Sequence, residues 1–247
     1  MDILGIDIGG SGIKGALVDV ETGNLTTERH KVLTPSPATQ SAVVSAVEEV
    51  VRHFGWKGAI GCGFPGLVIN GIVRTAPNIN DVLVGIDSQQ LLRTTTGSDV
   101  TVLNDADTAG VAEMTFGAGR DQPGTVFMLT FGTGIGSAIF RDGDLVPNAE
   151  LGHLEVGGVE AEKFASAQIR KDLKLSWEGW AKRVSKVLQT YEALFSPDLF
   201  IIGGGVSRKA DKFFPLLRTK YARIVPAQMQ NNAGIVGAAM AAAERNG

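Results

Sequence analysis

The stretch that decides the fold is residues 3–20, which read ILGIDIGGSGIKGALVDV. Two apolar runs, residues 3–6 and 16–18, flank a glycine-rich corner and predict the two strands of a hairpin. Glycines let backbone N–H groups approach a ligand closely, Ser11 adds a hydroxyl, and Lys14 adds a compact positive charge. A phosphate chain fits such a corner, but an ordinary hairpin with a glycine turn fits the same residues. The residues at the corner are Asp7, Gly9, Gly10, Ser11, Gly12 and Lys14.

Asp7 ends the first predicted strand. Its carboxylate can hold Mg²⁺ there, directly or through water, because a hard cation prefers oxygen ligands. The corner is not a Walker A loop, since that motif needs Gly-x-x-x-x-Gly-Lys-Ser/Thr at the start of a helix.

The pattern of strand, glycine corner and returning strand occurs again from residue 125, with Thr133 and Gly134 in the second corner. We therefore expect an α/β protein with an internal duplication, and both corners on one cleft. A third corner, Gly203-Gly204-Gly205, follows a buried strand and either leaves room for a nucleotide base or makes a tight turn. A helix is expected after it, over residues 209–221.

Composition limits the possible functions. The net charge of −3 over 247 residues argues against general nucleic-acid binding. No apolar run reaches the roughly 18–20 residues of a membrane span, and the start of the chain does not read as a signal peptide. The single cysteine, Cys62, excludes an intrachain disulfide and a multi-cysteine zinc cluster. A cytoplasmic protein that does not bind a membrane is expected.

One segment departs from the acidic average. Residues 161–223 hold 13 Lys and Arg against 6 Asp and Glu, a balance of +7, whereas the rest of the chain carries −10. Solvated helix faces are the default explanation of such a segment, and a track for a polyanion is the alternative. The candidates for such a track are Lys182, Arg183, Lys186, Arg208, Lys209 and Lys212.

Asn104 and Asp105 stand between a predicted strand and the helix that follows it. A carboxylate at this place can take the proton of a hydroxyl that attacks phosphorus, and the preceding amide can orient the acceptor. The alternative is that Asp105 only caps the helix. Because Asp107 can cap equally well, we favour the functional role for Asp105.

A second polar cluster is Glu150-Leu-Gly-His153. Its carboxylate and imidazole can both hydrogen-bond the hydroxyls of a sugar, or Glu150 can be the partner of a structural histidine. Glu162 is either another sugar contact or a carboxylate that the helix dipole favours at a helix start.

With these motifs assembled, the chain resembles the ROK family of sugar kinases, within the actin/hexokinase/Hsp70 superfamily. The resemblance covers nearly the whole chain. It rests on the sequences DIGGSGIK at 7–14, GFPG at 63–66, NDA at 104–106, FGTGIG at 131–136, ELGH at 150–153 and IGGG at 202–205.

The resemblance implies a two-lobed α/β fold, actin-like or ribonuclease H-like, built from a duplicated half with the active-site cleft between the lobes. We expect a small N-terminal lobe over residues 1–106, completed by a C-terminal helix over 232–247, and a larger lobe over 107–231. A homodimer is expected on the same ground.

The resemblance also implies roles for the site residues. Asp105 is then the general base on the 6-hydroxyl of glucose. The implied glucose contacts are Gly66, Asn104, Asp105, Glu150, His153 and Glu162. The implied phosphate and ATP contacts are Asp7, Gly9, Gly10, Ser11, Gly12, Lys14, Thr133, Gly134, Gly204 and Gly205.

One departure from the family pattern bears on the structural zinc and on the phosphoryl donor. Most members bind a structural zinc through a cysteine motif that follows the Glu-x-Gly-His segment, and residues 154–162 contain no cysteine. We therefore expect no zinc site. The short, cysteine-free segment resembles members that phosphorylate glucose from inorganic polyphosphate, often from ATP as well. A basic groove would attract such a polyanion and make its binding strongly salt-dependent.

Three other functions compete with this prediction. The chain can be an ATP-dependent kinase for another hexose, such as fructose or N-acetylmannosamine. A sugar-responsive repressor needs an N-terminal helix-turn-helix domain, which this sequence does not show. A non-catalytic sugar sensor would leave Asp7, Lys14 and Asp105 unexplained.

Overall fold

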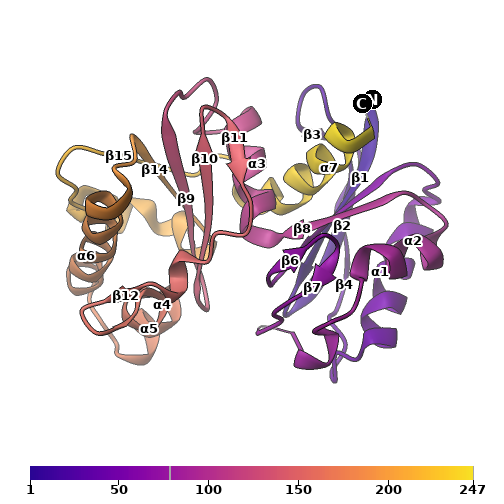
Figure 1. The fold of residues 1–247 in the computed structure, drawn as a ribbon, viewed down its shortest axis with the longest axis horizontal. Helices are drawn as coiled ribbons and strands as arrows, with labels where there is room; N and C mark the ends of the chain where they lie inside the picture. The colour runs from indigo at the N-terminus through magenta and orange to yellow at the C-terminus, as the bar shows by residue number, and fades with distance from the viewer. Residues whose placement is uncertain (78, 247) are drawn as a thin grey trace. The chain divides into compact units, whose positions relative to one another are not determined.

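The computed structural model describes residues 1–77 and 79–246, which form two compact units (Figure 1). Unit 1 comprises Met1–Ala112 and Asn232–Gly247, and unit 2 comprises Glu113–Asn231. The lobe boundaries expected from the sequence stay a prediction.

Unit 1 is built on a mixed sheet in which the strands of the path lie in the order β3-β2-β1-β5-β8, with β4 paired to β2. The opening hairpin pairs β1 with β2 in antiparallel fashion, and β5 and β8 continue the sheet in parallel. The strands are β1 (Asp2–Gly9), β2 (Gly12–Asp19), β3 (Asn24–Leu25), β4 (His30–Val32), β5 (Ile60–Phe64) and β8 (Val100–Asn104). A small separate sheet pairs β6 (Val68–Ile69) with β7 (Ile72–Val73), and η1 (Asp81–Leu83) follows it.

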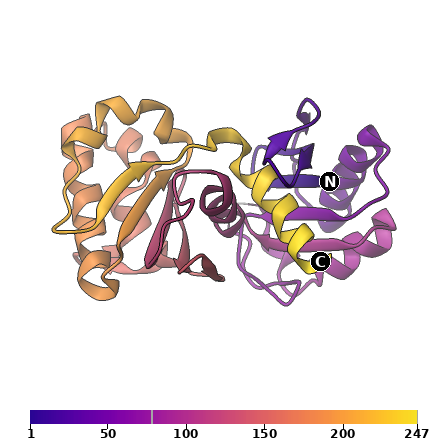
Figure 2. The same ribbon diagram turned by 90° about the horizontal axis from the view of Figure 1, so that it is seen from above.

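Helices cover the sheet of unit 1. Helix α1 (Gln40–Phe54) begins where Thr39 accepts a hydrogen bond from Ala42 N and ends at Gly55 in the left-handed conformation. Helix α7 (Ala233–Asn246) packs against β1 and β5, as Figure 2 shows in yellow. The approach is close enough that a Cβ at Gly61 would lie 1.7 Å from the carbonyl oxygen of Ala238. Helix α2 (Ser88–Thr96) packs against β8, and α3 (Asp105–Phe116) follows β8, with Asp105–Ala112 in unit 1.

Unit 2 repeats the topology of unit 1. Its sheet has the order β11-β10-β9-β14-β15, again with an antiparallel hairpin followed by parallel strands. The strands are β9 (Thr125–Phe131), β10 (Ile135–Arg141), β11 (Asp144–Val146), β14 (Leu199–Gly203) and β15 (Arg223–Pro226). The duplication expected from the two glycine corners is therefore present in the sheets.

An aromatic core stabilises unit 2. Trp180 of α6 (Trp177–Phe195) is fully buried and makes edge-to-face contacts with Phe131 and Phe213. The remaining elements are η2 (Leu151–His153), β12 (Glu155–Val156), β13 (Val159–Glu160), α4 (Ala161–Ala165), α5 (Ala167–Asp172), η3 (Gly205–Lys212), η4 (Phe214–Leu216) and η5 (Gln230–Asn232).

The helix predicted over residues 209–221 is wrong. Lys209 has non-helical backbone angles inside η3, and Pro215 lies in the first turn of η4. Proline donates no backbone hydrogen bond and favours a helix start over a helix interior. The segment therefore forms two short 3₁₀ helices.

Across residues 1–77 and 79–246, no helix combines the length and apolar character that crossing a membrane requires.

Candidate active site

The first glycine corner lies at the tip of the β1–β2 hairpin, where Gly9 pairs with Gly12 and Gly10 and Ser11 form the exposed turn. Asp7 and Lys14 face each other across the two strands, and Lys14 Nζ lies 3.2 Å from Asp7 Oδ2. Both side chains are partly exposed. The corner therefore presents backbone N–H groups, a hydroxyl, an ammonium and a carboxylate at one end of the sheet.

Sequence reasoning missed a second cation at this corner. Lys31 of β4 pairs with Lys14 of β2, and its side chain passes over Gly12 so closely that a Cβ there would lie 2.3 Å from Lys31 Cε. In the sequence, the only indication of this cation is the charge of Lys31 itself, between His30 and Val32 in a short strand. Because β4 is far from the corner in sequence, spacing alone does not place Lys31 there.

Asn104 ends β8 and caps α3. Its side-chain oxygen accepts hydrogen bonds from Ala106 N at 2.8 Å and Asp107 N at 3.1 Å, which satisfies two N–H groups that lack helix partners. Its side-chain nitrogen donates to the carbonyl oxygen of Gly66 over 3.1 Å. The structure thus brings together Gly66 and Asn104, and it assigns Asn104 a structural role in addition to any contact with a ligand.

Asp105 is the first residue of α3 and is partly exposed. Because Asn104 caps α3, the structure does not support the alternative in which Asp105 only caps this helix. The positive end of the helix dipole favours a negative charge at this position. A carboxylate held there can accept a proton from a hydroxyl.

The second and third corners meet within unit 2. Thr133 is exposed at the tip of the β9–β10 hairpin. Gly204, with φ of +82°, follows β14 and lies so close to Phe131 that a Cβ would be 2.6 Å from the Phe131 carbonyl oxygen. Only glycine fits this position easily, since both the backbone angle and the space exclude a side chain. The turn into η3 therefore lies beside the Gly132-Thr133-Gly134 corner.

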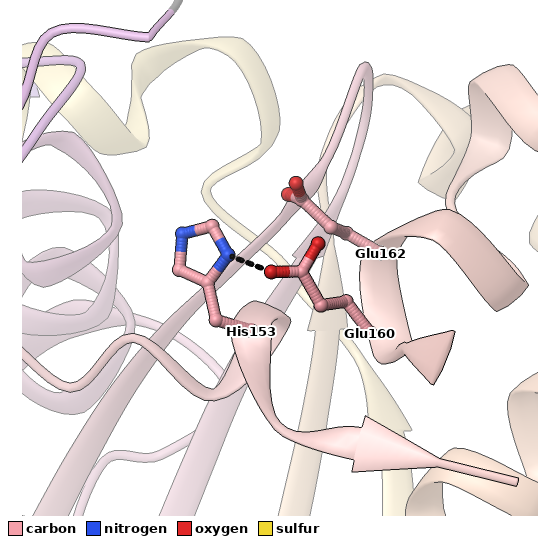
Figure 3. Close-up of side chains that lie close together, drawn as sticks. All are labelled: His153, Glu160 and Glu162. Carbon is pink, nitrogen blue, oxygen red and sulfur yellow. Dashed lines mark hydrogen bonds and ion pairs between the residues drawn. The ribbon is translucent and has the colours of Figure 1, made fainter. Parts of the chain in front are cut away.

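Figure 3 shows His153 and Glu162 of unit 2 with a third residue, Glu160. Atoms of the three side chains that can bind a metal all lie within 4.8 Å of one another. Glu162 lies against the second corner, because a Cβ on Gly134 would be 2.3 Å from Glu162 Oε2. Sequence reasoning singled out His153 and Glu162 but missed Glu160.

Glu150 belongs to the same cluster. Desolvation by burial raises the pKa of its carboxyl group, the charge of Glu162 raises it further, and His153 opposes the shift. The three residues proposed from sequence as sugar contacts in this unit are thus close enough to influence one another electrostatically.

The six basic candidates divide between α6 and η3. Lys182 pairs with Glu178 on α6, and Arg183 lies over the Phe164 ring while donating to its carbonyl oxygen. On η3, which starts directly after Gly204, the basic side chains are exposed. These exposed residues are Arg208, Lys209 and Lys212.

Each unit therefore carries its own part of the predicted site on one copy of a repeated sheet. Two copies of this α/β topology, each with a glycine corner between its first two strands, define the actin-like fold of sugar kinases. The chain belongs to the ROK family, whose sequence profile matches residues 3–168.

Two curated relatives indicate which members of the ROK family this chain resembles. The chain is 52% identical to the polyphosphate glucokinase of Mycobacterium tuberculosis over 238 residues, which cover 96% of this chain and 89% of that protein. It is 51% identical to the polyphosphate glucokinase of Mycobacterium leprae over 96% of this chain and 73% of that protein.

Solved structures agree with this grouping. The inorganic polyphosphate/ATP-glucomannokinase of Arthrobacter sp. strain KM is 46% identical, with a TM-score of 0.93 and 99% of each chain covered. A ROK family glucokinase from Streptomyces griseus, solved with glucose and AMPPNP, is 27% identical, with a TM-score of 0.83 and 100% of each chain covered.

Proposed function

We propose that the protein transfers a phosphoryl group from inorganic polyphosphate or ATP to glucose and forms glucose 6-phosphate. The observation that carries this proposal is the 52% identity to a polyphosphate glucokinase over 96% of the chain. Two features support it: the hairpin corner with Lys14, which suits a phosphate chain, and the carboxylate of Asp105 at a helix start, which suits a base.

In the proposed mechanism, Asp105 takes the proton of the glucose 6-hydroxyl as its oxygen attacks the terminal phosphorus of the donor. Asn104 holds the start of α3, and so fixes the position of Asp105. Glu150, His153 and Glu162 bind other hydroxyls of the sugar. Because carboxylates only accept hydrogen bonds, the two glutamates select for hydroxyl groups that can donate.

The donor phosphates are proposed to lie on the glycine corners. The backbone N–H groups of residues 9–12, the Ser11 hydroxyl and Lys14 bind phosphate oxygens in unit 1, and Thr133 and Gly134 do so in unit 2. Arg208, Lys209 and Lys212 extend the positive charge beyond Gly204 and Gly205. A longer polyphosphate chain would gain affinity from them, with a marked dependence on salt.

The residues at the first corner fit Mg²⁺. Asp7 offers a partly exposed carboxylate, and Lys14 shares one of its oxygens at 3.2 Å. Bound Mg²⁺ would supply charge neutralisation for the phosphate oxygens. Lys14 supplies a compensating positive charge from the protein itself, and its ion pair holds the Asp7 carboxylate across the hairpin.

The expected setting is the cytoplasm, with a homodimer as the working form. Cys62, the single cysteine, is buried, and burial raises the pKa of its thiol to about 12. It is therefore inert as a nucleophile. Size-exclusion chromatography with light scattering tests the dimer.

The experiment that tests the function is glucose 6-phosphate formation with glucose and Mg²⁺, with nucleotide-free polyphosphate in one reaction and ATP in another. Turnover with polyphosphate supports the proposal. Turnover with ATP alone restricts the protein to ordinary glucokinase activity, and no turnover with either donor contradicts the proposal.

Mannose is a second candidate acceptor, because the 46% identical solved structure is named a glucomannokinase. It is tested in the same assay in place of glucose. Fructose and N-acetylmannosamine, the other acceptors considered from the sequence, are tested in the same assay.

A further inference from the structure

Glu160 contacts His153 although it is seven residues away in sequence. Glu160 Oε1 lies 3.3 Å from His153 Nδ1, and Figure 3 marks this contact with a dashed line. His153 is 54% exposed and Glu160 is 30% exposed, so the pair lies at the surface of unit 2. A ligand can therefore reach the imidazole on the side away from Glu160.

The contact determines which ring nitrogen carries the proton. An ionised carboxylate only accepts hydrogen bonds, so Nδ1 is the donor to Glu160. In a neutral imidazole with Nδ1 protonated, Nε2 has the free lone pair and accepts a hydrogen bond. The Glu160 contact therefore leaves Nε2 able to accept a hydrogen bond from a hydroxyl group.

Glu160 is itself held in place. Its second carboxylate oxygen pairs with Lys163, three residues later on α4. It ends the β12–β13 hairpin, where it pairs with Glu155, and the next residue donates from Ala161 N to Leu154 O over 2.9 Å. The hydrogen bond from Lys163 lowers the pKa of the Glu160 carboxyl, with a smaller contribution from His153, so Glu160 is ionised at neutral pH.

We propose that Glu160 is a positioning residue for the sugar: it fixes the Nδ1–H tautomer and the ring orientation of His153, so that Nε2 accepts a hydrogen bond from a sugar hydroxyl. This inference rests on the proposed function only in naming a sugar as the ligand. The rival interpretation is a divalent cation held by His153, Glu160 and Glu162. The cation is disfavoured because both Glu160 oxygens already have partners, His153 Nδ1 at Oε1 and the Lys163 ammonium at Oε2.

The first test is the tautomer of His153, measured by ¹⁵N NMR of the imidazole rings in the full chain at a pH where the histidines are neutral. The chain has only three histidines, and loss of one set of signals in His153→Gln assigns them. We expect a proton on Nδ1 in the wild type and in Glu160→Gln, whose amide oxygen still accepts. We expect loss of this preference in Glu160→Ala. A proton on Nε2 in the wild type, or an unchanged tautomer in Glu160→Ala, would overturn the inference.

The second test is kinetic. Glu160→Ala should raise the KM for glucose roughly tenfold with kcat nearly unchanged, and Glu160→Gln should recover most of the loss. The matched control is Glu155→Ala, on the exposed position opposite Glu160 in the hairpin, which should keep the wild-type KM. A Glu160→Ala variant with the wild-type KM, or one with a matching loss in Glu155→Ala, would contradict the positioning role.

Two outcomes separate this inference from its alternatives. If the wild type does not phosphorylate glucose but His153 shows the Glu160-dependent tautomer, the proposed function fails while the Glu160–His153 coupling stands. If the wild type binds one equivalent of Zn²⁺ tightly in calorimetry and Glu160→Ala abolishes the binding, the cation interpretation replaces the sugar-positioning one.

Discussion

Lys14 Nζ lies 3.2 Å from Asp7 Oδ2, across the first two strands of the chain. A partly exposed ion pair of this kind contributes at most about 1 kcal/mol to stability. The position of the ion pair beside a glycine corner is therefore better explained by a role in ligand binding than by a contribution to stability. The pair orients the Asp7 carboxylate at the point where a phosphate chain and its cation are proposed to bind.

Asp7→Asn should lower kcat by at least about tenfold and raise the Mg²⁺ concentration needed for half-maximal activity, because an amide is a weaker ligand for a hard cation. The measurement is the glucose 6-phosphate rate over a Mg²⁺ titration. Asp2→Asn, at the exposed start of the same strand, is the control and should behave as the wild type. An unchanged Mg²⁺ curve in Asp7→Asn would exclude Asp7 as a metal ligand.

Asp105→Asn should lower kcat by about 10²- to 10⁴-fold, the usual contribution of a general base. The melting temperature should change little, because Asn104 caps α3. Asn104→Ala should lower stability as well, by about 1 kcal/mol, because the cap of α3 is lost. Substantial turnover in Asp105→Asn would remove it from the role of base.

Gly134→Ala should lower kcat/KM for glucose by roughly ten- to hundredfold, because the new Cβ would displace the Glu162 carboxylate, 2.3 Å away. Gly132→Ala is the matched comparison, since no atom outside residues 131–133 lies within 4 Å of a Cβ built there. Its KM for glucose should match that of the wild type. Equal losses in both variants would indicate a general sensitivity of the corner to side chains, without a role for Glu162.

Lys31→Met should raise the KM for polyphosphate several-fold and weaken its dependence on salt, because one cation at the first corner is lost. The KM for glucose should not change. Lys57→Met, an exposed lysine outside the corner, is the control. Steady-state kinetics at several salt concentrations measure both effects, and an unaltered polyphosphate KM would rule out a contact with Lys31.

Glu192 gives a prediction about stability. Its buried carboxylate accepts hydrogen bonds at 2.8 Å from the backbone N–H groups of Lys220, Tyr221 and Ala222. Although desolvation opposes it, this set of donors lowers the pKa of Glu192. A lowered pKa in the folded state means that the stabilisation is present at neutral pH and is lost as the pH falls through the folded-state pKa.

Glu192→Gln should therefore lower the free energy of unfolding by about 2 kcal/mol at pH 7, because an amide cannot accept all three bonds. The difference from the wild type should shrink toward acid pH. Chemical denaturation at several pH values measures it, with Glu178→Gln on the exposed start of the same helix as the control. A difference that grows toward acid pH would contradict the sign of this argument.

Much of the fold follows from local sequence. The hairpin of residues 3–20 and its repeat from residue 125 combine apolar, β-branched runs with glycine turns, which specify strands and corners through short-range geometry. The helix over residues 209–221 was predicted wrongly because its basic and apolar spacing suits a helix. Pro215 and the hydrogen bonds that Glu192 makes with the backbone at 220–222 favour a different path.

The sequence by itself determined the ROK family and the two glycine corners, because these depend on residue types at fixed spacing. Tertiary structure alone decided three things: that Asn104 and not Asp105 caps α3, that Lys31 lies over Gly12, and that Glu160 holds His153. The Asn104 cap is a local choice between two neighbouring side chains, which the residue types alone leave open. The Lys31 and Glu160 contacts join groups whose distance depends on strand register and on the path of a turn. Spacing along the chain does not encode that distance, since a one-residue shift in register moves a side chain to the opposite face of the sheet.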